Sequence, residues 1–215
     1  MNVLVLSSHP DDETIGMGGT INKLSKQGHK ISLCVVTDGS NHKDGDKKRS
    51  NQRRNDCKKV AKLLGISKTI FLDYPDTRLD QISQVEVNSA LENVIKKVKP
   101  SIVFIPPDND LHTDHSKVHN CALVACRPLA NKIKQIYTYE ILGYVKDQFQ
   151  PNVYVDIEKN LSKKIAAFKM FKTEQQDFPF HRSIKSIENL SIRRGIESGL
   201  KCAEAFKLIR KIDVF

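Results

Sequence analysis

Short apolar runs alternate with amphipathic stretches along most of this 215-residue chain. The runs have the length of buried strands and the stretches carry helical spacing, so they predict strands and helices in turn. Gly28, Gly65 and Pro100 stand where three of the helices are expected to end. Strands are predicted over residues 3–7, 31–36, 69–72, 102–105, 135–142 and 152–157. Helices are predicted over residues 13–27, 53–64, 85–98, 116–126, 161–172 and 187–209.

The order of these elements indicates the fold class. Repeated strand–helix units favour a largely parallel sheet that helices cover on both faces. The rhythm weakens after about residue 130, which predicts a core over residues 1–130 and a C-terminal strand and helix extension over residues 131–215. A chain of 215 residues can bury one sizeable core, so we expect a single α/β domain.

Composition is that of an ordinary globular protein, with 39% hydrophobic and 28% charged residues. The chain lacks the run of about 18 apolar residues that a membrane span needs. Its opening apolar run is short and has no basic leader. Five scattered cysteines without CxxC spacing fit a reducing compartment, and we expect Cys34 on a strand and Cys202 on a helix face to be buried thiols. A cytoplasmic protein is the expectation.

The formal net charge is +10, and much of the positive charge falls within residues 43–62. A solvated helix face explains such a run, and so does attraction to an anionic substrate or to a membrane surface. Zinc-finger spacing, an RNP-like aromatic motif and tryptophan are all missing from the sequence, which argues against nucleic acid as a partner. Any membrane association is expected to be peripheral, and a homo-oligomer is left open.

Two polar motifs follow predicted strands and carry the candidate chemistry. His9-Pro10-Asp11-Asp12-Glu13 comes after the strand over residues 3–7, and His112-Thr113-Asp114-His115 comes after the strand over residues 102–105. Ligands of open α/β sheets bind just beyond the carboxyl ends of the strands. The two motifs are therefore expected to converge on one metal ion.

A catalytic zinc ion usually keeps three protein ligands and a water molecule. His9, Asp12 and His115 supply such a set, and the metal would make hydroxide available near neutral pH. Asp11 lies beside two of these ligands and is the candidate general base.

The remaining motif residues also have candidate roles. His112, if protonated, would stabilise the oxyanion or donate to the leaving amine. Asp114 would orient His112 and keep it charged.

Either motif by itself also fits a purely structural role. His-Pro is ordinary turn chemistry, and an Asp before a helix is a common cap. Two His- and Asp-containing motifs, both after buried strands, favour the metal site. Gly16, Gly18 and Gly19 fall inside a predicted helix rather than in the preceding turn, so they indicate close packing rather than a dinucleotide site. His29, His42 and His181 are expected on the surface. A surface position is also favoured for His119, although it lies one turn after His115 and facing the pocket is the alternative.

The paired motifs resemble those of the LmbE-like, or GlcNAc-phosphatidylinositol de-N-acetylase (PIG-L), family. The resemblance includes Ile15-Gly-Met-Gly-Gly19 after the first motif and Arg53-x-x-Asp56, where the family usually has Glu. Near the C-terminus, Gly195, Gly199 and Ala203-Glu-Ala-Phe206 are similar to the family ending, and residues 164–175 are similar to its Lys-rich segment. Nearly the whole chain is covered. Asp110 stands where some family members carry Tyr.

The resemblance implies a Rossmann-like three-layer αβα sandwich with a mostly parallel sheet. It also implies a zinc-dependent hydrolase that removes the acetyl group from an N-acetylated amino sugar of the GlcNAc type, with one Zn²⁺ per chain or another divalent ion such as Fe²⁺. It assigns the metal to His9, Asp12 and His115, the base to Asp11, and transition-state support to His112 with Asp114.

The substrate is less well defined by the resemblance. A small-molecule or glycolipid N-acetyl sugar is expected, and the basic residues favour an anionic lipid- or nucleotide-linked one. Arg53, Asp76 and Arg78 are the candidate substrate-binding residues, although a salt-bridged turn explains the last two equally well. Hydrolysis of another N-acyl amide, or non-catalytic sugar or nucleotide binding, are the alternatives.

Overall fold

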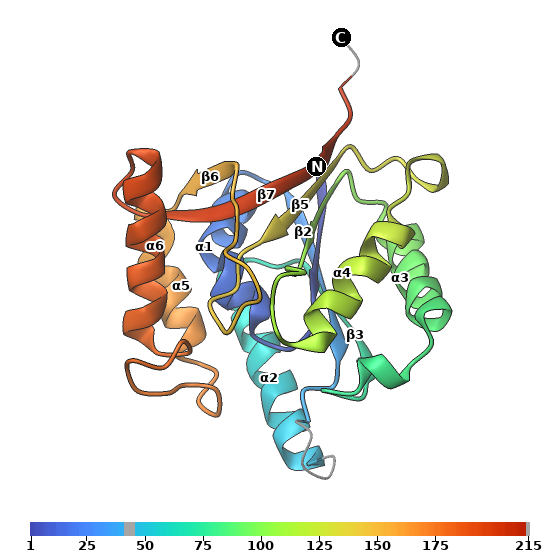
Figure 1. Ribbon diagram of the computed structural model, residues 1–215, viewed down its shortest axis with the longest axis horizontal. Helices are drawn as coiled ribbons and strands as arrows, with labels where there is room; N and C mark the ends of the chain where they lie inside the picture. The colour runs from blue at the N-terminus through green and yellow to red at the C-terminus, as the bar shows by residue number, and fades with distance from the viewer. Residues whose placement is uncertain (41–45, 214–215) are drawn as a thin grey trace.

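The computed structural model describes residues 1–40 and 46–213. In this part of the chain, one seven-stranded sheet lies between two layers of helices (Figure 1). The strands are β1 (Asn2–Ser7), β2 (Lys30–Thr37), β3 (Lys68–Tyr74), β4 (Ile102–Ile105), β5 (Gln135–Tyr139), β6 (Val153–Asp156) and β7 (Ala203–Lys211). The α-helices are α1 (Asp12–Lys26), α2 (Lys47–Leu64), α3 (Gln84–Val98), α4 (Thr113–Ala125), α5 (Leu161–Phe168) and α6 (Ile184–Ser198).

The sheet has the strand order β3-β2-β1-β4-β5-β7-β6. The first five strands in this order pair in parallel, whereas β7 runs antiparallel to both β5 and β6. The predicted Rossmann-like αβα fold with a mostly parallel sheet is confirmed. Since parallel strands point the same way, the loops after β1, β3, β4 and β5 meet at one edge of the sheet.

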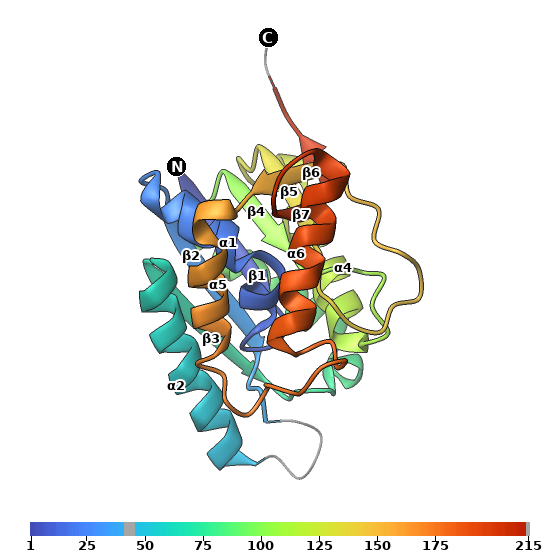
Figure 2. The same ribbon diagram turned by 90° about the vertical axis from the view of Figure 1, so that its left-hand side faces the viewer.

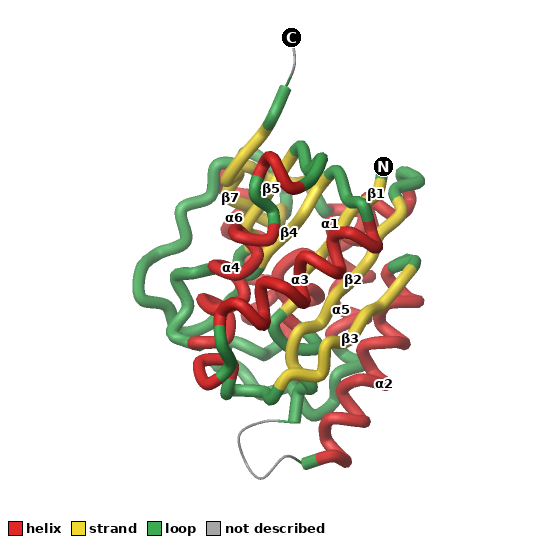
Figure 3. The backbone as a smooth tube through the Cα atoms, turned by 90° about the vertical axis from the view of Figure 1, so that its right-hand side faces the viewer, coloured by secondary structure: helices red, strands yellow, loops and turns green. Residues whose placement is uncertain are grey.

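Helices cover both faces of the sheet, which explains the continuous apolar runs of its central strands. Figure 2 shows α1, α2, α5 and α6 on one side, and Figure 3 shows α3 and α4 on the other. Successive side chains of a strand point to opposite faces. Accordingly Val3 and Val5 of β1 join the core beneath the first group of helices, while Leu4 and Leu6 join the core beneath the second.

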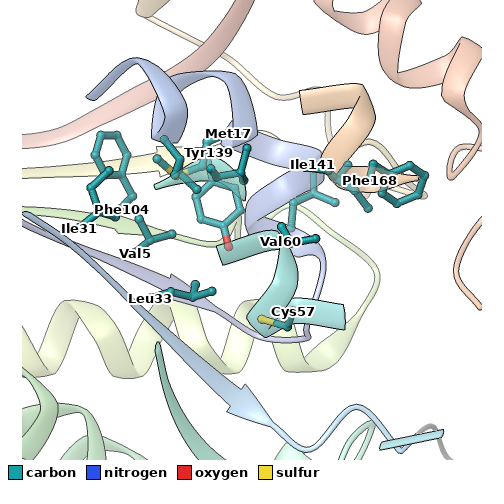
Figure 4. Close-up of a cluster of buried hydrophobic side chains, with 14 of the residues drawn as sticks. Val5, Met17, Ile31, Leu33, Cys57, Val60, Phe104, Tyr139, Ile141 and Phe168 are labelled. Carbon is teal, nitrogen blue, oxygen red and sulfur yellow. The ribbon is translucent and has the colours of Figure 1, made fainter. Parts of the chain in front are cut away.

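The larger core gathers side chains from distant parts of the chain (Figure 4). Val5 of β1, Leu33 of β2 and Val60 of α2 lie in one cluster with Tyr139 of β5 and Phe168 of α5. The Tyr139 hydroxyl donates a hydrogen bond to the Leu6 carbonyl oxygen at 2.8 Å, so the one polar atom of this buried ring has a partner. This core fixes β1 and α1, and with them the turn that carries the first motif.

Two α1 glycines permit this close packing. A Cβ atom on Gly16 would lie 2.4 Å from the Tyr139 ring, and one on Gly19 would lie 2.9 Å from the Ile157 side chain. Both distances are shorter than side-chain carbons tolerate. The packing role expected of these glycines therefore holds.

The C-terminal extension differs from the prediction. The helix predicted over residues 187–209 ends at Ser198, because Gly199 adopts a left-handed conformation with φ 71°. Residues beyond it form β7, which pairs between β5 and β6, so the helix prediction for that segment is wrong. Cys202 is buried as expected, but it lies just before β7 and not on a helix.

Five helices begin earlier than predicted: α1 and α3 by one residue, α4 and α6 by three, and α2 by six. In α2, the cap is Asp46, whose carboxylate accepts hydrogen bonds from the backbone N–H groups of Lys48 and Arg49. In α4, the cap is His112 of the second motif. Every α-helix in the described ranges is too short or too polar to cross a lipid bilayer.

Candidate metal-binding site

Three side chains from the two motifs meet at the carboxyl edge of the sheet. His9 lies in the turn after β1, Asp12 begins α1, and His115 lies in the first turn of α4. All three are buried. The Asp12 carboxylate accepts a hydrogen bond from the His9 backbone N–H at 2.8 Å, which closes the turn and orients both residues.

The donor atoms of these residues form a nearly equilateral triangle. His9 Nδ1 lies 3.3 Å from Asp12 Oδ2 and 3.2 Å from His115 Nε2, and His115 Nε2 lies 3.4 Å from Asp12 Oδ2. A tetrahedral ion with bonds of about 2.0–2.1 Å requires ligand separations of about 3.3–3.4 Å. The other oxygen, Asp12 Oδ1, is buried without a hydrogen-bond partner among the described residues. The donor geometry therefore fits a bound metal ion.

Other donors also lie near His9. Nitrogens of His9, His112 and His115 fall within 4.8 Å of one another, and so do donors of His9, Asp76, His112 and Asp114. The oxygens of Asp114, however, already accept the backbone N–H groups of Thr77 and Leu79. His9, Asp12 and His115 together supply two imidazoles and one carboxylate, a donor set that suits Zn²⁺ or Fe²⁺.

Charges at this site also favour a cation. Burial opposes protonation of His9, but the nearby carboxylates of Asp12, Asp114 and Asp76 raise its pKa well above the usual value. Burial also opposes protonation of His115, but Asp12 and Asp110 together raise its pKa. Both imidazoles in turn hold the pKa of Asp12 well below its usual value, against the effect of burial. A coordinating imidazole must be neutral, so a metal ion would compete with protons for these two rings.

Carboxylates lie behind both candidate histidine ligands. His115 Nδ1 is 2.8 Å from Asp110 Oδ2, and His9 Nε2 is 3.1 Å from both Asp114 Oδ2 and Asp76 Oδ1. Such carboxylate partners fix the ring orientation and tautomer of metal-binding histidines. Asp110, which replaces the Tyr of some relatives, is thereby placed to orient His115.

His112 lies beside the donors without being one of the triangle. Its ring centroid is 4.5 Å from that of His9. Its Nδ1 accepts the Asp114 backbone N–H at 3.3 Å, which leaves the ring proton on Nε2. Burial, with positive His9 and His115 nearby, lowers the pKa of His112 to about 4. His112 is therefore neutral near pH 7 in this structure, and the Asp114 carboxylate contacts His9 instead of holding His112 charged.

Asp11 lies behind this group and is held by arginines. Its Oδ1 accepts a hydrogen bond from Arg53 at 3.0 Å, and its Oδ2 lies 3.4 Å from an Arg182 nitrogen. Burial raises the pKa of Asp11, although both arginines act against it. Its φ of 153° is rare for a residue with a side chain, and such backbone strain concentrates at functional sites.

A cavity of about 480 Å³ opens over these residues. Its lining includes His9, His112 and His115, and the predicted substrate residues Arg53 and Asp76 also contribute to it. The cavity wall further includes Arg49, Tyr144, Glu174, Phe180, His181 and Arg182. Arg78, the third predicted substrate residue, is exposed and lies outside this lining.

Two of the surface histidines were predicted wrongly. His119 is buried, and its Nδ1 lies 2.9 Å from the Pro106 carbonyl oxygen. His181 lines the cavity, beside Arg182, which the sequence did not single out. The loop before α6 has no periodicity that could have shown this. His29 is half-buried, and His42 lies outside the described residues.

The profile of the PIG-L family, described as GlcNAc-PI de-N-acetylase, matches residues 4–126, more than half of the chain and both motifs. The Escherichia coli (strain K12) protein named Uncharacterized deacetylase YaiS is 33% identical over 181 residues, covering 80% of this chain and 90% of its own. The structure of N,N'-diacetylchitobiose deacetylase from Pyrococcus horikoshii has a TM-score of 0.82 at 26% identity, covering 97% of this chain and 83% of its own.

A hydratase shares the fold as well. GalB, the 4-carboxy-2-hydroxymuconate hydratase of Pseudomonas putida KT2440, has a TM-score of 0.82 at 19% identity and covers 100% of this chain and 99% of its own. The fold alone therefore does not specify the reaction. The family profile and the relative that is 33% identical establish the ancestry, and the chain belongs to the PIG-L family of LmbE-like deacetylases.

Proposed function

We propose that this protein is a metal-dependent hydrolase that removes the acetyl group from an N-acetylated amino sugar. The triangle of His9 Nδ1, Asp12 Oδ2 and His115 Nε2 is the observation that carries the proposal, because its separations of 3.2–3.4 Å suit a tetrahedral ion. Membership of a deacetylase family supports the choice of reaction.

These three residues would hold the metal, which we propose to be one Zn²⁺ per chain, with Fe²⁺ as the other candidate. A divalent ion there supplies a Lewis acid for the acetyl carbonyl and lowers the pKa of water. Asp110 and Asp114 would keep the two imidazoles in place through His115 Nδ1 and His9 Nε2.

Asp11 is proposed as the general base. Its raised pKa suits a carboxylate that must take a proton from water and later deliver it to the leaving amine. Arg53 and Arg182 hold its two oxygens and keep them from turning away. His112, neutral and with its proton on Nε2, would donate a hydrogen bond to the acetyl oxygen as negative charge develops there.

Arg53 and Asp76 line the cavity and are proposed to contact sugar hydroxyls. Hydrolysis of a different N-acyl amide would use the same residues. A non-catalytic sugar- or nucleotide-binding protein would have no use for a buried, strained Asp11. We also propose a cytoplasmic location, since all five cysteines are buried and unpaired.

Amine release from N-acetylglucosamine and N,N'-diacetylchitobiose tests this proposal. Metal-stripped protein, protein reloaded with Zn²⁺ or Fe²⁺, and the Asp11→Asn variant would be compared, with bound metal quantified. Loss of the base is expected to lower kcat by about 10²–10⁴-fold while the metal stays bound. Asp80→Asn, a change of an exposed carboxylate, is the matched control and keeps its activity. Stoichiometric metal without amine release from either sugar, from the 1- and 6-phosphates of N-acetylglucosamine or from N-acetylmuramic acid would overturn the proposal.

A further inference from the structure

Two arginines on the cavity wall do not contact the acetyl group in the proposed hydrolysis. Arg49 has no role in that proposal, and Arg182 only holds Asp11. Arg49, in the first turn of α2, and Arg182, just before α6, line the same cavity as His9 and His112. Their side chains are 31% and 23% exposed, so both remain accessible. They come from segments about 130 residues apart and meet at Glu174, whose two oxygens each take one of them.

Both guanidinium groups retain unused donors. Each carries five N–H groups in a planar fork. Arg49 contacts Glu174 through one terminal nitrogen at 2.9 Å, and Arg182 contacts Glu174 at 2.8 Å and Asp11 at 3.4 Å through one terminal nitrogen. The Nε of Arg49 is buried without a hydrogen-bond partner among the described residues. An arginine with free donors at a cavity wall is suited to a phosphate or a carboxylate.

The third arginine of this wall, Arg53, is more fully engaged with protein partners than Arg49 and Arg182. Arg53 donates to Asp11 at 3.0 Å and to the Gly39 carbonyl oxygen at 3.2 Å, and it also lies near Asp76 and Glu174. Glu174 is therefore shared by three guanidinium groups. The Arg49 guanidinium has no second carboxylate within 4.0 Å in the described part of the chain, so Glu174 is its one counter-charge there.

Aromatic side chains continue the wall next to Arg182. The His181 ring lies 4.5 Å from the Phe180 ring and 5.3 Å from the Tyr144 ring, centroid to centroid. Phe180 and Tyr144 are both exposed although they line the cavity. Apolar ring faces beside arginine donors provide a surface for the body of a sugar or its substituent.

We propose that Arg49 and Arg182 form an anion-binding subsite for a phosphate or carboxylate group carried by the amino-sugar substrate. The inference rests on the proposed deacetylation and names the substrate class: an N-acetylated amino sugar with an anionic substituent. The acetamido group lies at the histidine donors, and the substituent extends past Glu174 to Arg49.

The test compares kcat/KM for four substrates with the metal-loaded enzyme. Neutral N-acetylglucosamine would be measured against its 1-phosphate, its 6-phosphate and N-acetylmuramic acid, which carries a carboxylate. At low ionic strength the wild type is expected to prefer at least one anionic substrate at least tenfold. Since a hydrogen bond to a charged group contributes about 1.5–3 kcal/mol, Arg49→Ala should lower this preference ratio about ten- to a hundredfold.

Lys48→Ala is the matched control, because it removes an equal charge from an exposed neighbour in the same turn. It should keep the wild-type ratio, and Arg49→Lys should recover part of it. A wild-type ratio near one, or an equal fall in Arg49→Ala and Lys48→Ala, would overturn the inference and leave the deacetylase proposal intact.

Binding measured without turnover separates the two proposals. Isothermal titration with glucosamine 6-phosphate, glucosamine 1-phosphate and neutral glucosamine would use the wild type, Arg49→Ala and Lys48→Ala. Phosphate-dependent binding that is lost only in Arg49→Ala supports the subsite even if no acetyl sugar is hydrolysed. Equal affinity for charged and neutral sugars in the wild type contradicts it, whether or not Arg49→Ala folds.

Discussion

Replacing Glu204 by Gln is expected to destabilise the protein by about 3–5 kcal/mol, because it leaves a buried ammonium without a counter-charge. The Glu204 carboxylate of β7 accepts the Lys164 ammonium of α5 at 2.7 Å, and both side chains are almost fully buried. It also accepts the backbone N–H groups of Gly19 and Thr20, at 2.9 and 2.6 Å. Helix α1 is interrupted at Met17, whose φ is −146°, so Gly19 and Thr20 begin a new helical segment. The N–H groups of a first helical turn have no acceptor within the helix and need one from outside.

The same contacts predict the behaviour of related variants. Glu204→Ala removes the acceptor of both N–H groups as well, and each buried unsatisfied group adds about 1–3 kcal/mol. Its total cost therefore approaches the stability of a typical domain, about 5–15 kcal/mol. Lys164→Met combined with Glu204→Gln removes both charges, so the double variant should be less destabilised than the sum of the single changes.

Urea unfolding followed by far-ultraviolet circular dichroism measures these free energies, since the chain has no tryptophan to report by fluorescence. Glu158→Gln, in the exposed pair between Glu158 and Lys201, is the matched control and should change stability little. A loss below about 1 kcal/mol for Glu204→Gln, or strict additivity in the double variant, would refute the assignment of Glu204 as counter-charge.

Three further predictions follow from the site and the core. Asp110→Asn should weaken metal binding about 10–100-fold, because His115 loses the carboxylate that contacts its Nδ1. Competition with a chelator measures the metal affinity, and an unchanged affinity would exclude this orienting role of Asp110. Metal binding should release protons and strengthen as pH rises, because the pKa values of His9 and His115 are raised and both rings must lose a proton to bind the ion. Titration calorimetry in buffers of different ionisation enthalpy measures this proton release, and its absence would contradict both histidines as ligands. Burial raises the thiol pKa values of Cys34 and Cys126 to about 12. Native protein at pH 8 should therefore resist iodoacetamide, while urea-unfolded protein reacts. Rapid labelling of either thiol in the native state would contradict its burial.

Sequence alone was sufficient for the parts of this protein that depend on local pattern. The centres of β1 and β4 are continuously apolar because both faces of the sheet are covered, and each strand is followed along the chain by one of the His- and Asp-containing motifs. Since parallel strands present their carboxyl ends at one edge, the convergence of His9 and His115 was predictable without coordinates. The donor separations then bear out that proximity.

Tertiary structure decided what local pattern does not encode. Residues 203–211 form β7 because β5 and β6 each pair with it through backbone hydrogen bonds. The spacing of apolar residues along the chain does not show that these two strands lie on either side. The Asp114 carboxylate contacts the His9 ring, whereas the His112 ring accepts only the Asp114 backbone N–H, since the direction of a side chain depends on the packing around it. Arg182 reaches Asp11 from a loop far along the chain, and loops carry no periodicity from which such a contact can be predicted. The sequence thus indicated which side chains converge at the proposed metal site, whereas only folding determined which charges surround them.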